Sequence, residues 1–257
     1  MTIVPLGQGG DHVAYLVDDR LVVRFRVDGD AADAAASVKR EAGVLAVAAE
    51  LSPLPVPRVE FVEPGAGCLA YELLPGVHLL DVAAGVRAQH AAAVAERLGR
   101  LLHALHAVPR ERAASLVDTD EPPMADWLAE AAEHYREVRA AIPAPHRPAV
   151  EAFLDGAPPD AAGELVFSHN DLGIEHVFVD PRSLEVTGVI DWSDAALVDP
   201  ARDFGLVLRD LGPAALDVAL AAYRPGDPAS LRERARFYAV AALLEDLAFG
   251  LETGRGE

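Results

Sequence analysis

The chain has 257 residues, of which 51% are hydrophobic and 25% charged, so its composition excludes a disordered protein and allows a sizeable buried core. The formal net charge of −19 argues against a nucleic acid partner, because phosphate binding needs clustered Lys and Arg. With one cysteine, Cys68, no signal-like start and no apolar run of membrane-spanning length, we expect a cytoplasmic monomer without a membrane partner.

The first part of the chain reads as an antiparallel sheet with one helix. Strand-like alternation or apolar runs cover residues 2–6, 13–17, 21–27, 59–62 and 68–74. Between the third and fourth runs, residues 31–51 carry apolar side chains at helical spacing until a series of prolines ends the pattern.

A glycine cluster lies at the first bend of this predicted sheet. Gly7, Gly9 and Gly10 would let backbone N–H groups approach phosphate oxygens. Most such clusters are plain hairpin turns, so the cluster alone is weak support for a nucleotide site.

The rest of the chain is mainly helical by its pattern. Helical spacing of apolar residues covers 91–108, 126–139, 148–154, 203–211, 214–223 and 231–251. The sequence therefore predicts an α+β fold, with strands and one helix first and a helical region after them.

Between the predicted helices lies the segment that carries the candidate chemistry. Asp171 and Asp191 stand at the edges of two short apolar runs, residues 177–179 and 186–190, which turn residues join into a predicted hairpin. Such a hairpin would bring Asp171, His176 and Asp191 around one point. Phosphoryl transfer needs a carboxylate that orients the attacking hydroxyl, and oxygen or nitrogen ligands for the metal on the nucleotide phosphates.

The motif H-N-D-L-x-x-x-H-x-x-x-D, followed by I-D-W, resembles the catalytic loop and metal-binding aspartate of the aminoglycoside phosphotransferase family. The resemblance implies a bilobal protein-kinase-like fold, with an N-terminal nucleotide-binding lobe of residues 1–75 and a helical C-terminal lobe of residues 76–257. It implies that Asp171 is the catalytic base and that His176 and Asp191 bind Mg²⁺. Most of the family has Asn where this chain has His176, and the aminoglycoside 2″- and macrolide 2′-phosphotransferase branches are known for a His there.

The resemblance also implies a nucleotide site in the first lobe. Arg24 on the third strand and Glu41 on the helix fit the places of a phosphate-binding cation and its paired carboxylate, although kinases use Lys at the first position. Arg26 lies on the same face of the strand as Arg24 and remains an alternative. In the run Y-E-L-L-P-G, the nucleotide base would bond main-chain atoms of Glu72, Leu73 and Leu74.

Further acidic residues are candidates for the acceptor or for structural roles. Asp194, Glu245 and Asp246 would meet the amines of a cationic acceptor, but carboxylates on a helix more often belong to a solvated face. We expect Asp203 to anchor the catalytic loop and to cap the helix that begins there, and Asp199 to serve a helix start. His103 and His106, in the motif L-H-A-L-H, are expected to pack or cap rather than bind a ligand.

The function implied by the resemblance is transfer of the γ-phosphate of ATP or GTP to a hydroxyl of an aminoglycoside, with Mg²⁺ as cofactor. A macrolide 2′-phosphotransferase, a metabolic small-molecule kinase and a non-catalytic pseudokinase remain alternatives. The acidic net charge fits a polycationic acceptor, but charge alone more often serves only solubility.

Overall fold

The computed structural model describes residues 1–8 and 12–254. Its N-terminal part is a five-stranded antiparallel sheet with the order β1-β2-β3-β5-β4. The strands are β1 (Ile3–Gln8), β2 (His12–Val17), β3 (Leu21–Arg26), β4 (Val59–Glu63) and β5 (Cys68–Glu72). A short 3₁₀ helix, η1 (Pro64–Ala66), joins β4 to β5.

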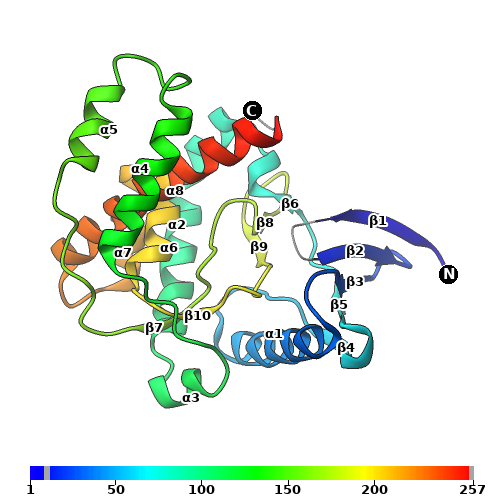
Figure 1. Cartoon of the computed structure of the whole chain (residues 1–257). Coiled ribbons are helices and arrows are strands. Elements are labelled where there is room, and N and C mark those ends of the chain that lie inside the picture. Colours follow the sequence, from blue (N-terminus) through cyan, green and yellow to red (C-terminus); the bar gives the residue numbers. More distant parts are fainter. Residues whose placement is uncertain (9–11, 255–257) are drawn as a thin grey trace.

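One helix, α1 (Ala31–Leu51), packs against β4 and β5. It begins where the Asp30 side chain accepts hydrogen bonds from the backbone N–H groups of Ala32 and Asp33, at 2.7 and 3.0 Å. Figure 1 shows the sheet and α1 on one side of the molecule and the remaining helices on the other.

The helical part is built on two pairs of packed helices. Helix α6 packs on α8, and α2 packs on α7, while α4 also lies against α8. The helices are α2 (Ala84–His106), α3 (Arg110–Ala114), α4 (Met124–Val138), α5 (Arg147–Leu154), α6 (Ala201–Leu211), α7 (Pro213–Tyr223) and α8 (Pro228–Thr253). The α2–α7 pair depends on a close backbone approach, because a Cβ added at Gly99 would lie 2.3 Å from the Ala219 carbonyl oxygen.

The segment between α5 and α6 contributes strands to two small sheets. Strands β6 (Val77–His78), β8 (Val177–Val179) and β9 (Val186–Val189) form one sheet, and β7 (Val166–Ser168) pairs with β10 (Ala196–Val198) in the other. The β8–β9 pairing confirms the predicted hairpin. A second 3₁₀ helix, η2 (Leu79–Asp81), follows β6.

A single hydrophobic core cluster runs through both parts of the molecule. It includes Leu45 and Leu69 beside the sheet, and Leu98, Phe167 and Trp192 in the helical part. The continuous core fixes the sheet relative to the segment that carries Asp171. The predicted α+β architecture is confirmed, while the boundary between residues 75 and 76 stays a prediction.

Several element boundaries differ from the prediction. Gly7 lies inside β1, where it pairs with Ala14 beyond an irregularity in the register, and not in a loop. Helix α2 begins seven residues earlier than the apolar stripe indicated, because Ala84–His90 adds an exposed first part with little apolar pattern. Strands β6, β7 and β10 were not predicted, because β6 pairs with β8 and β7 with β10 across long stretches of chain and no hairpin turn signals these pairings. No helix in the described ranges is long and apolar enough to cross a bilayer.

Candidate active site

Arg24 links the sheet to the segment that follows β9. Its Nη1 donates to Glu41 Oε1 at 2.9 Å, and both terminal nitrogens lie 3.3 Å from Asp191 Oδ1. Burial disfavours the charged form, but the attraction of Glu41 and Asp191 outweighs it and raises the pKa of Arg24. The guanidinium therefore stays charged at a point where three elements meet.

Arg26 lies on the same face of β3 but makes different contacts. Its Nε donates to Asp28 Oδ1 at 2.8 Å, and its Nη1 donates to Ser37 Oγ at 2.5 Å, one turn before Glu41 on α1. Arg24 is thus the arginine of this pair that contacts Asp191.

The loop after β7 is held in place by Asp203. This fully buried carboxylate accepts from the backbone N–H groups of Asn170 and Leu172, each at 3.2 Å, and from Ser168 Oγ. Asn170 has φ of 71°, a left-handed conformation that Asn tolerates better than most residues. The predicted anchoring of the loop by Asp203 is confirmed.

The predicted capping role of Asp203 is wrong. The N–H of Ala201, at the start of α6, donates to Asp199 Oδ1 at 2.8 Å, so Asp199 serves the helix start as expected. The Asp203 side chain instead points to the loop, because its carboxylate is needed to pair backbone N–H groups that would otherwise be buried without partners.

The histidines of the L-H-A-L-H motif form hydrogen bonds inside the fold. Ser168 donates its hydroxyl hydrogen to Asp203, so His106 Nε2, at 2.8 Å, must donate to Ser168, and His106 Nδ1 then accepts from the Tyr223 hydroxyl at 3.0 Å. Burial lowers the pKa of His106 to about 4, although Asp203 opposes this shift. His103 contacts the Tyr223 carbonyl oxygen, which confirms the structural role expected of both histidines.

Asp171 lies at the centre of the candidate site. Its Oδ2 is 3.5 Å from His176 Nδ1, and its side chain is 40% exposed, so it is accessible to a ligand. Burial raises the pKa of Asp171; His176 opposes the shift, and the charges of Glu175, Asp191 and Asp203 add to it. A carboxylate with a raised pKa is better suited to accept a proton than an ordinary surface aspartate.

Asp191 and His176 could hold a divalent metal ion. Asp191 follows β9 with φ of 60°, a strained conformation often found at functional sites. Burial works against its charge, but Arg24 and then His176 hold the pKa of Asp191 below its ordinary value.

The protein side chains at this site would supply only part of the coordination shell of Mg²⁺. His176 Nδ1 is buried and has no hydrogen bond within the described part of the chain. Among residues 1–8 and 12–254, no cluster of three or more His, Cys, Asp or Glu could hold a metal. This agrees with a Mg²⁺ that takes one or two protein ligands and completes its shell with water and phosphate oxygens.

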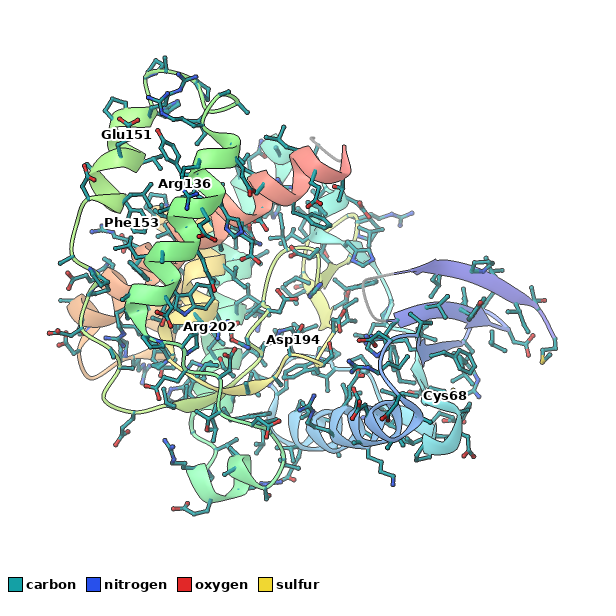
Figure 2. The ribbon with its side chains drawn as sticks, viewed as in Figure 1. Cys68, Arg136, Glu151, Phe153, Asp194 and Arg202 are labelled. Carbon is teal, nitrogen blue, oxygen red and sulfur yellow. The ribbon has the colours of Figure 1, made fainter. Side chains whose placement is uncertain are left out.

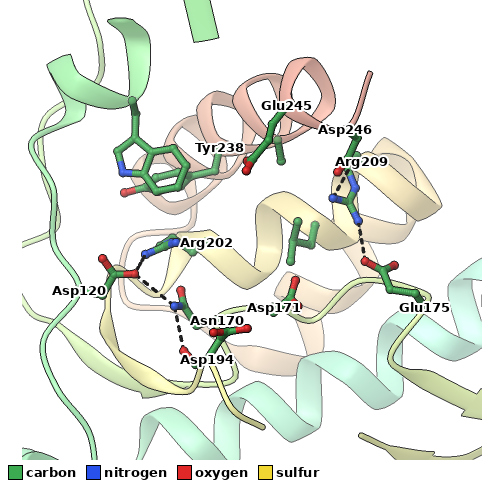
Figure 3. Close-up of a pocket in the computed structure, with 13 residues that line it drawn as sticks. Asp120, Asn170, Asp171, Glu175, Asp194, Arg202, Arg209, Tyr238, Glu245 and Asp246 are labelled. Carbon is green, nitrogen blue, oxygen red and sulfur yellow. Dashed lines mark hydrogen bonds and ion pairs between the residues drawn. The ribbon is translucent and has the colours of Figure 1, made fainter. Parts of the chain in front are cut away.

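A cleft of about 420 Å³ opens beside Asp171. It contains all three predicted acceptor residues, Asp194, Glu245 and Asp246, together with the base candidate. Its lining is Asp120, Trp127, Asn170, Asp171, Glu175, Asp194, Arg202, Leu206, Arg209, Tyr238, Ala242, Glu245 and Asp246. Figure 3 shows Arg202 and Arg209 on opposite sides of Asp171, with Glu245 above it. Figure 2 shows Asp194 nearer the sheet and Arg202 further into the helical part.

In the segment predicted to bind the nucleotide base, some main-chain groups already form hydrogen bonds within the protein. The N–H of Glu72 donates to the Arg58 carbonyl at 3.0 Å, and that of Leu73 donates to the Arg20 carbonyl at 2.8 Å. These two N–H groups are already paired, so a nucleotide base would have to use other main-chain atoms of the segment. The Leu74 side chain contacts Gly188, where an added Cβ would lie 2.3 Å from Leu74 Cδ1. Gly9 and Gly10 lie outside the described residues.

Sequence reasoning missed several cleft residues. Arg202, Leu206 and Arg209 have the i, i+4, i+7 spacing that places them on one face of α6, and this spacing was a usable signal. Trp127 and Asp120 carry none, since only the tertiary fold brings them to the cleft.

An N-terminal antiparallel sheet with one helix, followed by a mainly helical part, is the protein-kinase-like arrangement. The chain belongs to the phosphotransferase enzyme family APH, whose model matches residues 2–238. No curated protein sequence matches the chain significantly.

Solved structures resemble it over nearly its whole length. The GDP complex of wild-type aminoglycoside 2'-phosphotransferase-IIIa has 20% identity and a TM-score of 0.76, and the match covers 98% of this chain and 87% of that one. The apoenzyme of macrolide 2'-phosphotransferase MphH from Brachybacterium faecium has 27% identity and a TM-score of 0.68, over 98% and 88%. The streptomycin–ATP complex of APH(2")-IIa has 16% identity and a TM-score of 0.66, over 97% and 86%.

Proposed function

We propose that this protein is an antibiotic kinase that transfers the γ-phosphate of ATP or GTP to a hydroxyl of a cationic small molecule, with an aminoglycoside as the first candidate acceptor. The observation that carries the proposal is the position of Asp171. Its carboxylate lines the acidic cleft, lies 3.5 Å from His176, and interacts electrostatically with Asp191. The proposal places the enzyme in the cytoplasm as a monomer.

In this mechanism Asp171 accepts and orients the proton of the acceptor hydroxyl. The gain in phosphoryl transfer comes mostly from positioning and charge stabilisation, so a single accessible carboxylate held on an anchored loop is sufficient. Asp203 holds that loop through the N–H groups of Asn170 and Leu172.

The nucleotide side of the mechanism uses Arg24, which Glu41 orients toward the phosphates. Asp191 and His176 would hold Mg²⁺, which neutralises charge on the phosphate oxygens. The base would bond main-chain atoms of Glu72, Leu73 or Leu74 that the protein leaves open, and we propose that Gly7 approaches the phosphates.

The charge of the cleft supports a cationic acceptor. Its lining contains six carboxylates, those of Asp120, Asp171, Glu175, Asp194, Glu245 and Asp246, against two guanidinium groups, those of Arg202 and Arg209. An excess of carboxylates in a concave site concentrates cations near the nucleophile-orienting residue. Aminoglycosides carry several ammonium groups beside hydroxyl groups, which is why they are the first candidate.

A macrolide is the second candidate acceptor. Among the similar structures, the macrolide 2'-phosphotransferase MphH has 27% identity to this chain, compared with 20% for aminoglycoside 2'-phosphotransferase-IIIa. A macrolide with an amino sugar also presents an ammonium group beside a hydroxyl.

The proposal is tested by incubating the protein with Mg²⁺, ATP or GTP, and separate aminoglycosides and macrolides, followed by mass spectrometry of the acceptor. A phosphorylated aminoglycoside is the expected product, and a phosphorylated macrolide would select the second candidate. Intact nucleotide binding with no phosphorylated antibiotic would contradict the antibiotic assignment and favour a metabolic kinase or a pseudokinase.

A further inference from the structure

Helix α6 presents two arginines to the acceptor cleft, and each is already paired. Arg202 donates to Asp120 at 2.6 Å and lies 4.7 Å above the Trp127 ring. Arg209, two turns later, lies at the opposite side of Asp171 (Figure 3). The cleft therefore has a resident cation at each side of the candidate base.

Arg209 is the more extensively paired of the two. It donates to Asp210 Oδ1 from Nε at 2.7 Å, its Nη1 lies 2.8 Å from Asp246 Oδ2, and its Nη2 lies 3.7 Å from Glu175 Oε1. Burial opposes its charge, but the hydrogen bond and charge of Asp210, with Asp246 and Glu175, outweigh burial and raise the pKa of Arg209. It therefore remains a cation throughout the accessible pH range.

The pairing connects three parts of the cleft. Asp246 belongs to α8, Glu175 to the loop after Asp171, and Asp210 also accepts from the backbone N–H of Ile174 at 3.1 Å. The Glu175 carboxylate folds over Gly173, where an added Cβ would lie 2.3 Å from Glu175 Oε1. Arg209 thus lies among three carboxylates, of which those of Glu175 and Asp246 line the cleft.

Glu245, the carboxylate next to Asp246 on α8, differs from Asp246 in its contacts. Glu245 lines the same cleft, is exposed, and makes no hydrogen bond or ion pair with any residue in the part of the chain that the structure describes. The two adjacent acidic residues that the sequence suggested as equivalent are therefore unequal: Asp246 is bound to a resident cation, and Glu245 is open to an incoming one.

We infer that Arg209 is a specificity-determining residue of the acceptor cleft. Because Arg209 pairs with the carboxylates of Glu175 and Asp246, it directs the ammonium group of the acceptor to Glu245. The inference rests on the proposed function, because it takes the acceptor to be a cationic compound with hydroxyl groups. It adds the orientation of that acceptor in the cleft. The acceptor places an ammonium group near Glu245 and uncharged hydroxyl or ether groups near Arg209. A second ammonium group beside Arg209 would meet a like charge and would have to share carboxylates that are already paired.

The test compares the binding of two probes by calorimetry at fixed ionic strength, without nucleotide. Kanamycin carries several amines, and erythromycin carries a single tertiary amine. In Arg209→Gln, the dissociation constant of kanamycin should fall by about fivefold or more, while that of erythromycin should change by less than about twofold. Arg209→Lys keeps the charge and should keep the wild-type ratio of the two constants.

A matched control separates a local from a global charge effect. Arg232, on α8, pairs with Asp217 outside the cleft, and Arg232→Gln changes the net charge by the same amount as Arg209→Gln. Arg232→Gln should leave the ratio unchanged. Because Asp210 is only 10% exposed, Arg209→Gln could fail to fold, and the double variant Arg209→Gln/Asp210→Asn then replaces it, since it leaves no buried charge without its partner.

An unchanged ratio in folded Arg209→Gln, or in the double variant that replaces it, would overturn the inference and leave the proposed function intact. An equal change of the ratio in Arg232→Gln would do the same. Absence of binding of both probes to the wild-type protein would overturn the inference together with the acceptor class. Nucleotide binding, measured on the same samples, shows in either case whether the proposed nucleotide site is functional, while phosphate transfer is tested by the assay given above for the proposed function.

Discussion

Arg24 Nη1 and Asp191 Oδ1 lie 3.3 Å apart, although the two residues are separated by 167 positions in the chain. The contact joins the third strand of the sheet to the residue that follows β9. Because Arg24 also pairs with Glu41, one guanidinium connects the sheet, α1 and the candidate metal ligand. This half-buried ion pair therefore adds to the hydrophobic core that fixes the sheet relative to the candidate catalytic loop.

Replacing Arg24 should weaken both the fold and nucleotide binding. In Arg24→Met, Glu41 loses this partner while its side chain is only 3% exposed, so the free energy of unfolding should fall by about 3 kcal/mol. Urea unfolding and the dissociation constant of ATP check this. Arg26→Met is the matched control, and a loss of nucleotide affinity as large as that of Arg24→Met would contradict the assignment of Arg24.

Asp191→Asn should abolish most of the dependence of nucleotide binding on Mg²⁺. Asn removes the carboxylate charge but tolerates the left-handed backbone at φ of 60°, so the variant should fold. The measurement is the ATP dissociation constant with Mg²⁺ and with a chelator. The same ratio of the two constants in the variant and the wild type would remove Asp191 from the metal site.

His176→Asn should retain phosphotransferase activity and change the preference among divalent metals. Asn supplies an oxygen ligand, which Mg²⁺ prefers, where the imidazole supplies nitrogen. Turnover with Mg²⁺ and with Mn²⁺ is compared in the two proteins. An unfolded variant would instead support a purely structural role for this partly buried histidine.

Acid should destabilise the fold through His106. Its folded-state pKa of about 4 lies below the ordinary 6.5, so the unfolded chain binds the proton first as the pH falls. Neutral His106 therefore contributes fully to the free energy of unfolding above pH 6.5. As the pH falls toward 4 this contribution, up to about 3 kcal/mol, is lost.

His106→Gln should therefore flatten the dependence of the free energy of unfolding on pH in that window. Urea unfolding at several pH values measures it, with His103→Gln, an exposed histidine on the same helix, as the control. An equal slope in His106→Gln and the wild type would contradict the stabilising role of this part-buried chain of hydrogen bonds.

The sequence was sufficient to predict the fold class and the group around Asp171, for local reasons. The turn between Val179 and Val186 joins strands of three and four residues, so the hairpin that places His176 and Asp191 follows from short-range signals. Arg24 and Glu41 could be proposed as a pair from the resemblance, and the structure shows their contact at 2.9 Å. Which of Arg24 and Arg26 binds the phosphates stays a prediction.

The acceptor cleft could not be predicted in the same way. Whether Asp246 or Glu245 is open depends on Arg209, which reaches Asp246 only because α6 packs on α8. The wrong capping prediction for Asp203 has the same origin. Its position near the start of a helix suggests a cap, but in the tertiary structure its carboxylate pairs with backbone N–H groups of the loop that would otherwise lack a partner. Pairings between distant elements leave no periodic signal in the sequence.

The most direct test of the account is transfer of the labelled γ-phosphate of ATP or GTP to an aminoglycoside or a macrolide, measured for the wild-type protein and for Asp171→Asn. The account predicts labelled acceptor with the wild type and a fall in kcat of at least about 100-fold in the variant, with folding and nucleotide binding retained. Undiminished transfer by Asp171→Asn would contradict the assignment of Asp171 as the catalytic base. No transfer by the wild type to either class of acceptor would contradict the proposed antibiotic kinase.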